Sequence, residues 1–361
     1  MNTDGAGRAI HQIMAGYADG DAISNEAVWL RDIFRSWGYT SDIYADLAHV
    51  SPNLRTACRS LSDYAAKSDD ICFHHYGITS PATEVFLASP AWKIMVYQNI
   101  TPAAYFTGFD DGLATQLREA RAGLREIAQQ ADEVWAASPF NAAELQAVGI
   151  DNIKVFPLLF PPATLERTPE PLIMKKFTGA LKSILFVGRI VPNKRIEDLI
   201  LAFGWYNIAI NPYSRLILVG SHRSAPRYYT MLRMLAGDLD LPNVCFEGFA
   251  SPAGLAAYYR IADLYVCPSV HEGYCLPLLE AMYMNLPVIA RRAGAMPDTM
   301  DGAGVLYDDL EPVELAELMH RVMFNPALRN DVMRSQDERM QRLRERPVEA
   351  ELKALLADRL S

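Results

Sequence analysis

The strongest constraint on the fold is a repeated alternation of short apolar runs with helical segments along both halves of the 361-residue chain. Near the start, Ala9–Met14 predicts a strand, the three-to-four spacing of apolar residues over Glu26–Trp37 predicts a helix, and Ser41–Ala45 predicts a second strand. Asn25 is the predicted N-cap of that helix. Because strands joined by helices pair in parallel, this pattern predicts a parallel sheet covered by helices.

The same alternation continues through the rest of the chain. Further strands are predicted at Asp70–His75, Ala91–Tyr97, Glu133–Ala137, Lys154–Pro157, Ser183–Gly188, Arg215–Gly220, Val244–Glu247, Asp263–Cys267 and Pro287–Ala290. Further helices are predicted at Leu113–Ala131, after an N-cap at Ser138 with Pro139 in the first turn, at Ile196–Ile208, Tyr228–Leu235, Pro252–Ile261 and Leu278–Met284, and from Val313 onward. The strands are nearly continuous runs of Val, Ile and Leu, which is typical of parallel strands covered on both faces.

A proline-rich span separates the two halves and is interpreted as a linker between two domains. Its prolines are Pro157, Pro161, Pro162, Pro169 and Pro171. The predicted organisation is an N-terminal α/β/α domain over residues 1–165, a C-terminal one over 166–335, and C-terminal helices over 336–361 that cross back to the N-terminal domain. Ligands of such folds bind at the carboxyl ends of the strands, which here predicts a site in the cleft between the domains.

Composition places the chain among soluble globular proteins, with 50% hydrophobic and 21% charged residues. No apolar run approaches the roughly 18–20 residues that span a bilayer, and the polar residues 1–9 lack the apolar core of a signal peptide, so a cytoplasmic location is expected. Residues 1–170 carry 12 basic and 21 acidic residues, which accounts for the whole net charge of −9. This balance argues against nucleic acid or a broad anionic membrane surface as a partner.

The five cysteines are Cys58, Cys72, Cys245, Cys267 and Cys275. None forms a C-x-x-C pair, and three lie in apolar, strand-like runs. We therefore expect reduced, mostly buried thiols, and neither a disulfide framework nor a zinc site.

The first chemical motif, F-V-G-R-I-V-P-N-K, follows a predicted strand. The strand ends at Gly188, and Arg189 and Lys194 follow in the loop. A glycine-containing loop that leads into a helix is a common phosphate site. Arg offers a fork of donors and Lys a point charge, which together suit a leaving diphosphate. From these residues alone, a solvated charged loop is an equal alternative.

The second motif, H-E-G-Y-C-L-P-L-L-E, runs from His271 to Glu280. Glu272 lies in a loop, and Glu280 lies about one turn into the following helix. Backbone N–H groups at the start of that helix favour an anion, and a carboxylate can accept two hydroxyl hydrogen bonds from a ribose diol. The alternative is that both glutamates are surface residues, with Glu280 only complementing the helix dipole.

In these motifs the sequence resembles the retaining GT-B glycosyltransferases of family 4, also called glycosyl transferases group 1. The matching elements cover the second domain in order and spacing, and they are G-R-x-x-x-x-K at Gly188, Arg189 and Lys194, E-x7-E at Glu272 and Glu280, and P-V-I-A at Pro287–Ala290. The resemblance implies an α/β GT-B fold, in which two Rossmann-like α/β/α domains face each other across a cleft. It also implies a hexosyltransferase that moves a sugar from a UDP- or GDP-sugar to a glycan, lipid-linked or small-molecule acceptor in bacterial polysaccharide or glycoconjugate synthesis.

The resemblance also implies a role for each matching position. Arg189 and Lys194 would bind the donor diphosphate and, with Glu272 at the donor sugar, form the catalytic set, while Glu280 would hold the ribose hydroxyls. The other implied donor-binding positions are Gly188, Gly248, Phe249, Gly273, Tyr274, Cys275 and Leu276. The family needs no divalent metal, so neither a metal nor another cofactor is expected, and the nucleotide-sugar is a substrate.

The first domain supplies weaker candidates for a donor or acceptor cleft. They are Gly20, Asp21, His74, His75, Gln98 and Asn99, all near the predicted carboxyl ends of strands. The family places Gly-rich backbone after the first strand, and this chain lacks a Gly-Gly there. Gln98 stands where many relatives carry a histidine, and a packed role for the two histidines is an equal alternative.

Other functions stay open at this stage. A sugar-nucleotide epimerase or hydrolase could use the same double-Rossmann fold, and a non-catalytic nucleotide-sugar sensor differs only in lacking turnover. A dinucleotide oxidoreductase is disfavoured because no G-x-G-x-x-G follows the first strand. Contact with a membrane is expected to be peripheral at most, and the sequence leaves the sugar, the base, the acceptor and the oligomeric state open.

Overall fold

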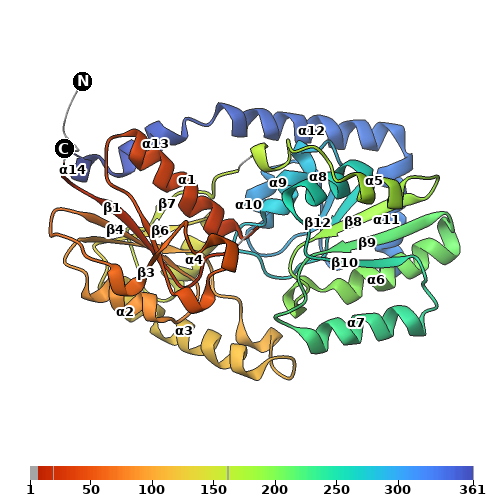
Figure 1. The fold of residues 1–361 in the computed structure, drawn as a ribbon. Helices are drawn as coiled ribbons and strands as arrows, with labels where there is room; N and C mark the ends of the chain where they lie inside the picture. The colour runs from red at the N-terminus through yellow and green to blue at the C-terminus, as the bar shows by residue number, and fades with distance from the viewer. Residues whose placement is uncertain (1–6, 19, 161, 361) are drawn as a thin grey trace. The chain divides into compact units, whose positions relative to one another are not determined.

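The chain forms two compact units in the computed structural model, each built on its own sheet (Figure 1). The structure describes residues 7–18, 20–160 and 162–360. The first unit comprises the chain up to Ala103, Gly112–Leu159 and the chain from Arg346, and the second comprises Ala104–Asp111 and Phe160–Glu345. The polar residues 1–6 and Pro161 of the predicted linker lie outside the described residues.

The first unit has, within its described residues, a seven-stranded parallel sheet in the order β3-β2-β1-β4-β5-β6-β7. The strands are β1 (Ile10–Met14), β2 (Ile43–Ala45), β3 (Arg59–Ser60), β4 (Ile71–Tyr76), β5 (Trp92–Tyr97), β6 (Glu133–Ala136) and β7 (Lys154–Val155). Strands β1 and β4 are buried along their whole length, as expected for central strands of a sheet with helices on both faces.

Helices from both ends of the chain cover this sheet. They are α1 (Ala22–Ser36), α2 (Pro81–Ala88), α3 (Asp111–Gln129), α4 (Pro139–Ala147), α13 (Val348–Leu355) and α14 (Ala357–Leu360), with short 3-10 turns η1 (Leu47–His49), η2 (Pro52–Leu54), η3 (Leu61–Asp63) and η4 (Ala103–Tyr105). Phe34 of α1, Phe73 of β4 and Trp135 of β6 share one core with Leu352 and Leu356 from the last turns of the chain. The C-terminal helices are therefore part of the first unit's core.

The second unit has, among its described residues, a six-stranded parallel sheet in the order β10-β9-β8-β11-β12-β13. Its strands are β8 (Lys182–Val187), β9 (Ser214–Val219), β10 (Val244–Gly248), β11 (Leu264–Cys267), β12 (Val288–Arg291) and β13 (Val305–Tyr307). Figure 1 shows α6 and α7 on one face of this sheet and α8 and α9 on the other.

The helices of the second unit continue the alternation. They are α5 (Pro171–Phe177), α6 (Ile196–Trp205), a π-helical turn η7 (Tyr206–Ile210), α7 (Pro226–Asp238), α8 (Pro252–Ile261), α9 (Leu276–Tyr283), α10 (Met296–Met300), α11 (Pro312–Phe324) and α12 (Pro326–Glu345), with 3-10 turns η5 (Pro162–Thr164) and η6 (Pro192–Lys194). None of the helices in the described ranges is both long and apolar enough to cross a bilayer.

Both sheets are doubly wound. The strands that directly follow the first strand are added on one side of it, and the later strands are added on its other side. The reversal lies between β1 and β4 in the first unit and between β8 and β11 in the second. Loops that follow two such strands leave the sheet side by side, in opposite directions, and form a crevice for ligands. The predicted α/β class with two parallel-sheet units is confirmed, and each unit has one position of this kind.

The N-terminus of α1 differs from the sequence prediction. The helix begins at Ala22, and the Asp21 side chain caps it by accepting a 3.0 Å hydrogen bond from the Ser24 amide. The prediction of Asn25 as the cap was wrong, because the apolar periodicity that located the helix starts one turn after its true beginning. The predicted cap of α4 is confirmed: the Asn141 amide donates to Ser138 Oγ at 3.1 Å, with Pro139 in the first turn.

Five of the described α-helices and β-strands, namely β3, α2, α5, α10 and β13, are not predicted from the sequence. The last two contain five and three residues, too few for a periodic pattern to appear. The predicted helix Ile196–Ile208 is also divided, because its second part forms the π-helical turn η7.

Candidate active site

Two loops meet at the reversal point of the second unit, one after β8 and one after β11. The strands are paired, with Ile184 opposite Leu264, so their carboxyl ends are adjacent. Buried Asn193 joins the loops: its Nδ2 donates to the His271 carbonyl at 3.0 Å, and its own carbonyl accepts from the Val270 amide at 3.0 Å. The fold therefore places the first predicted motif directly against the second.

Lys194 and Glu272 are the side chains that this junction brings together. Lys194 Nζ lies 2.5 Å from Glu272 Oε1, and the two side chains are only 14% and 10% exposed. Burial disfavours the charge on Lys194, but Glu272 and the nearby thiol of Cys275 outweigh it and raise the pKa of the ammonium group above its ordinary value. Lys194 is therefore positively charged at the place where the loops after β8 and β11 meet.

The backbone of Gly294 lies directly against the backbone of Glu272. Its φ of +55° lies in the left-handed region, and a Cβ there would stand 2.5 Å from the Glu272 carbonyl oxygen and 2.7 Å from its nitrogen. The neighbouring Ala295 amide donates to the same carbonyl at 2.9 Å. Only glycine allows this close approach, which fixes the position of the Glu272 loop.

Helix α9 begins where the second motif turns back into the unit. Cys275 adopts a left-handed conformation with φ +74° directly before the helix, and Thr299 holds the preceding residue through a hydrogen bond to the Tyr274 carbonyl. Glu280 lies one turn into α9 and accepts a 2.7 Å hydrogen bond from the Tyr259 hydroxyl. Burial raises the pKa of Glu280, an effect that this hydrogen bond partly offsets.

Arg189, the other predicted cationic residue, is exposed directly after Gly188 at the end of β8. Among the described residues, no side chain pairs with its guanidinium. Gly188 itself lies against Gly220 at the end of β9, where a Cβ would stand 1.8 Å from the Gly188 carbonyl oxygen. The structure thus brings Lys194 and Glu272 into contact, but it leaves Arg189 free to meet a ligand.

The end of β10 completes the row of strand termini. The Gly220 amide donates to the Gly248 carbonyl at 2.7 Å, and Gly248 has a left-handed φ of +69°. Phe249 follows, and its side chain is 61% exposed. Of these two implied donor-binding positions, Phe249 therefore presents an uncovered ring at this edge of the sheet.

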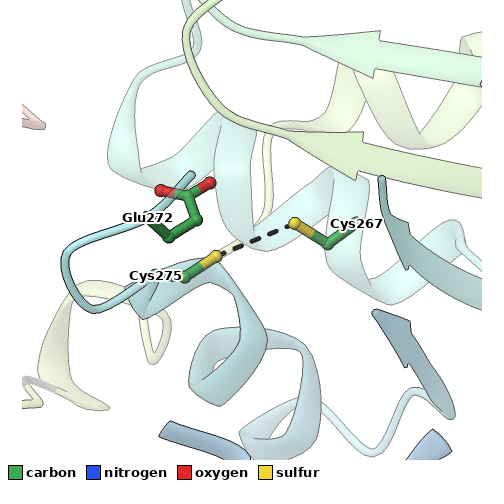
Figure 2. Close-up of side chains that lie close together, drawn as sticks. All are labelled: Cys267, Glu272 and Cys275. Atoms are coloured by element: carbon green, nitrogen blue, oxygen red, sulfur yellow. Dashed lines mark hydrogen bonds between the residues drawn. The ribbon is translucent and has the colours of Figure 1, made fainter. Parts of the chain in front are cut away.

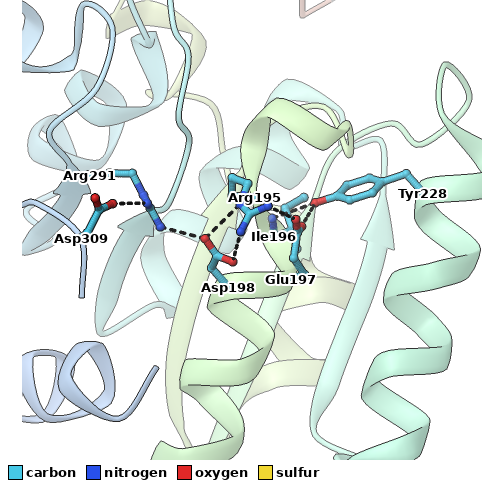
Figure 3. A network of polar contacts seen from close by, with 7 residues as sticks. All are labelled: Arg195, Ile196, Glu197, Asp198, Tyr228, Arg291 and Asp309. Carbon is cyan, nitrogen blue, oxygen red and sulfur yellow. Dashed lines mark hydrogen bonds and ion pairs between the residues drawn. The ribbon is translucent and has the colours of Figure 1, made fainter. Parts of the chain in front are cut away.

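A charged network fixes the start of α6, directly after Lys194 (Figure 3). Arg195 is left-handed at φ +51° and binds Asp198 through two nitrogens at 3.1 and 2.8 Å. Asp198 also accepts from Arg291 of β12 at 2.8 Å, and Arg291 extends the chain of ion pairs to Asp309 at 3.1 Å. On the other side, the Ile196 amide and Glu197 both hydrogen-bond the Tyr228 hydroxyl. The start of α6, and with it the loop that carries Lys194, is thus anchored to β12 and α7.

The histidines predicted for the first unit are interior residues. His74 is fully buried, with Nδ1 3.2 Å from the Ile13 carbonyl and Nε2 3.2 Å from Thr83 Oγ1. Burial lowers its pKa to about 4, so the ring is neutral. Both ring nitrogens are occupied, which favours the packed role for His74 over contact with a ligand.

His75 belongs to a buried hydrogen-bonded chain with Glu26, Gln98 and Gln12. Gln98 Nε2 donates to Glu26 Oε2 at 2.8 Å and to His75 Nδ1 at 3.1 Å, and His75 Nε2 lies 2.9 Å from Gln12 Oε1. Gln12 Nε2 in turn donates to the Ala27 carbonyl at 2.6 Å. This donor order requires a neutral His75 with its proton on Nε2. Burial lowers the pKa of His75 to about 3 and raises that of Glu26 to about 8.

The three other first-unit candidates have different surroundings. Gly20 and Asp21 are exposed after β1, and Asp21 is engaged as the cap of α1. Asn99 follows β5 with a left-handed φ of +81°, and its Nδ2 donates to Asn141 and Glu144 at 3.0 and 2.7 Å. The buried amide of Gln98 and the engaged amide of Asn99 therefore have structural roles within this unit.

Several residues that position the site have no signal in the sequence. Asn193, Tyr259 and Gly294 act through contacts with residues far away in the chain, so a single sequence does not reveal them. Tyr105 is a further example, because the segment Ala104–Asp111 belongs to the second unit and its ring lies 6.5 Å from that of His271.

Comparison with known proteins gives a consistent result. Residues 175–339 match the sequence model of the family described as glycosyl transferases group 1. The D-inositol 3-phosphate glycosyltransferase of Thermobifida fusca is 26% identical over 308 residues, covering 80% of this chain and 70% of that enzyme.

Two further likenesses concern part of the sequence and the fold. The GDP-mannose-dependent monoacylated alpha-(1-6)-phosphatidylinositol monomannoside mannosyltransferase of Corynebacterium glutamicum is 31% identical over 178 residues, which is 47% of this chain and 45% of that enzyme. Anabaena HepE, solved in complex with UDP-glucose, has a similar fold with a TM-score of 0.71 at 21% identity, covering 97% of this chain and 99% of that one.

Proposed function

We propose that the chain is a glycosyltransferase of group 1, the family whose sequence model matches residues 175–339, and that it is a retaining enzyme that uses a UDP- or GDP-sugar as donor. The proposed acceptor is a glycan, a lipid-linked glycan or a small molecule in bacterial polysaccharide or glycoconjugate synthesis. The observation that carries the proposal is the buried contact of Lys194 with Glu272, made where the loops after β8 and β11 leave the sheet in opposite directions.

Each side chain at this position suits one part of a nucleotide-sugar. Lys194 and the exposed Arg189 offer positive charge to the diphosphate. Glu280, one turn into α9 beside the Tyr259 hydroxyl, is suited to a ribose diol. Glu272 is suited to the hydroxyls of the donor sugar, since only one of its oxygens is paired with Lys194.

We further propose that the acceptor attacks from the face that the diphosphate leaves. The bond between the anomeric carbon and the phosphate oxygen breaks, the acceptor oxygen forms the new bond on the same face, and the acceptor proton passes to the departing phosphate oxygen. The protein then needs no nucleophile of its own, and its contribution is electrostatic stabilisation of the leaving diphosphate. Removing one well-placed donor of this kind typically lowers the rate by about 10²–10³.

The same proposal specifies the metal requirement, the substrates and the location of the enzyme. No metal ion is required to neutralise the diphosphate, because Arg, Lys and helix amides bind it. The names of two relatives support the donor and acceptor classes, because one includes GDP-mannose and a phosphatidylinositol mannoside, and the other includes inositol 3-phosphate. We place the enzyme in the cytoplasm, with at most peripheral contact with a membrane, and its oligomeric state is open.

The test is a panel of UDP- and GDP-sugars screened by thermal shift, followed by a turnover assay with candidate acceptors. A donor present at about 100 times its Kd should stabilise the protein by about 2.7 kcal/mol.

The variant Glu272→Gln should abolish sugar transfer. Glu311 is an exposed residue of the same unit, and Glu311→Gln should not change transfer. Donor loss without acceptor would indicate a hydrolase or epimerase, and binding without turnover a sensor. Near-normal turnover by Glu272→Gln, or strict dependence on Mg²⁺, would count against the mechanism.

A further inference from the structure

Two cysteine thiols and the carboxylate of Glu272 lie together between β11 and α9 (Figure 2). Cys267 is the last residue of β11, Cys275 directly precedes α9, and their sulfur atoms are 3.9 Å apart. One ligand atom from each of the three residues lies within 4.8 Å of the other two. The sequence pattern contains no signal for this cluster, because the two cysteines are not in a C-x-x-C pair.

The distance between the sulfurs matches a metal site better than a disulfide. A disulfide has a sulfur–sulfur bond of about 2.05 Å, so the pair would have to close by almost half of its separation. Two thiolates on one tetrahedral Zn²⁺, with Zn–S bonds of about 2.3 Å, are about 3.8 Å apart. The thiols already stand at this distance without any movement of the loop.

We propose that Cys267, Cys275 and Glu272 form a binding site for a thiophilic divalent cation such as Zn²⁺. Cysteine sulfur and glutamate oxygen are both zinc ligands, and in a site with three protein ligands a water molecule can take the fourth position. A further soft atom lies close to the cluster, since the sulfur of Cys267 is 3.6 Å from Met296 Sδ. Cys267 is buried, whereas Cys275 is half-buried, so an ion would enter from the side of Cys275.

The charges of the cluster balance before and after binding. Without the ion, the carboxylate of Glu272 neutralises the ammonium group of Lys194. On binding, two S–H groups lose their protons to solvent and two Zn–S bonds form, so the two new negative charges offset the charge of the cation.

An ion at this site would oppose donor binding. It would engage Glu272 and fix the start of α9, the two features that the proposed function assigns to the donor sugar and its phosphates. This second part rests on the proposed function, whereas cation binding itself does not. The site is thus an inhibitory one, and the proposed reaction remains independent of metal.

The metal site is tested with Co²⁺ as a spectroscopic probe on the full chain, kept reduced with a phosphine. One equivalent of Co²⁺ should produce thiolate-to-cobalt charge-transfer absorption, and Zn²⁺ should displace it. Cys267→Ser and Cys275→Ser should each abolish the absorption, and Glu272→Gln should weaken Co²⁺ binding by about tenfold or more. Cys245→Ser, at a half-buried cysteine of β10 outside the cluster, is the matched control and should behave like the wild type.

Absence of the charge-transfer band in the folded wild type would overturn the site, as would a band that survives in both Cys275→Ser and Glu272→Gln. These two variants decide the question even if the buried Cys267→Ser does not fold.

For the inhibitory part, saturating Zn²⁺ should raise the Kd of UDP or GDP by about tenfold or more in the wild type, and adding Zn²⁺ should not change this Kd in Cys275→Ser. A cobalt band together with an unchanged nucleotide Kd would overturn inhibition alone. If no nucleotide binds even without metal, the proposed function fails and the cobalt result still stands.

Discussion

At the residue scale, the ion pair of Lys194 with Glu272 combines a structural with a proposed catalytic role. Both side chains are largely removed from water, so deleting one leaves the charge of the other uncompensated. We expect Lys194→Ala to lower the free energy of unfolding by about 3 kcal/mol and to weaken nucleoside diphosphate binding, measured by denaturation and calorimetry.

Arg189→Ala is the matched comparison, because this side chain is exposed and pairs with no described residue. Its unfolding free energy should stay within about 0.5 kcal/mol of the wild type, while diphosphate affinity falls. Unchanged diphosphate binding in both variants would remove the phosphate role, whatever happens to stability.

The buried chain of Glu26, Gln98, His75 and Gln12 gives a prediction for pH. Burial raises the pKa of Glu26 from 4.5 to about 8, so the folded protein keeps this carboxyl protonated where the unfolded chain does not. The stability that this group contributes is complete below pH 4.5 and is lost as the pH rises to about 8. His75, lowered to about 3, acts in the opposite direction, and its contribution is lost as the pH falls below 6.5.

Glu26→Gln keeps an acceptor for Gln98 and removes the titration. Relative to wild type, its free energy of unfolding should therefore rise by a few kcal/mol between about pH 5 and pH 8, as followed by urea denaturation at each pH. Glu119→Gln, an exposed glutamate on α3, should follow the wild-type profile. Parallel profiles for wild type and Glu26→Gln would mean that Glu26 is ionised in the folded state.

At the element scale, the position of the Glu272 loop depends on the absence of a side chain at Gly294. Alanine there must adopt a left-handed φ and also push against the Glu272 backbone. Gly302 is the matched control, because its φ is +82° and a Cβ added there would meet no neighbouring atom within 4 Å. We expect Gly302→Ala to cost about 1–2 kcal/mol and Gly294→Ala about 1–3 kcal/mol more, with weakened donor binding only in the latter. Equal losses in the two variants would show that the loop can move aside freely.

The cap of α1 allows a direct comparison of the residue predicted from sequence with the one in the structure. Asp21→Ala should destabilise the first unit by about 1 kcal/mol, because the Ser24 amide loses its acceptor. Asn25→Ala, inside the helix, should be close to neutral. Thermal or chemical denaturation of the two variants decides which residue caps the helix.

The elements that can be predicted are those with a long apolar pattern of their own. The strands β1, β4, β5, β8 and β9 agree with their predicted ranges within about one residue, because an uninterrupted run of apolar residues needs no tertiary information. In the site, the two motifs predict that Lys194 and Glu272 serve one ligand, but the ion pair between them is seen only in the structure. The contact of Gly294 with Glu272 and the approach of Cys267 to Cys275 could not be predicted, because they depend on how separate loops pack.

At the scale of the whole molecule, the C-terminal helices support a unit whose other parts lie at the beginning of the chain. Leu352 is fully buried among side chains of α1 and the first sheet. Leu352→Ala should cost about 2–5 kcal/mol and speed hydrogen exchange in β1, β4 and β5, with β8 and β11 unchanged. Leu172→Ala, at a 74% exposed position on α5, should leave both regions unchanged. Faster exchange in both sheets would instead indicate one cooperative unit.

The chain passes from one unit to the other more than once, since Ala104–Asp111 belongs with the second unit and the residues from Arg346 with the first. Dividing the chain at residue 160 would therefore give two fragments, each of which lacks a segment of its own unit. The N-terminal fragment would lose the helix that carries Leu352, and the C-terminal fragment would lose the segment Ala104–Asp111, which brings Tyr105 to His271. Anyone who wishes to study the second unit in isolation would have to graft Ala104–Asp111 back onto it, or supply these residues as a peptide.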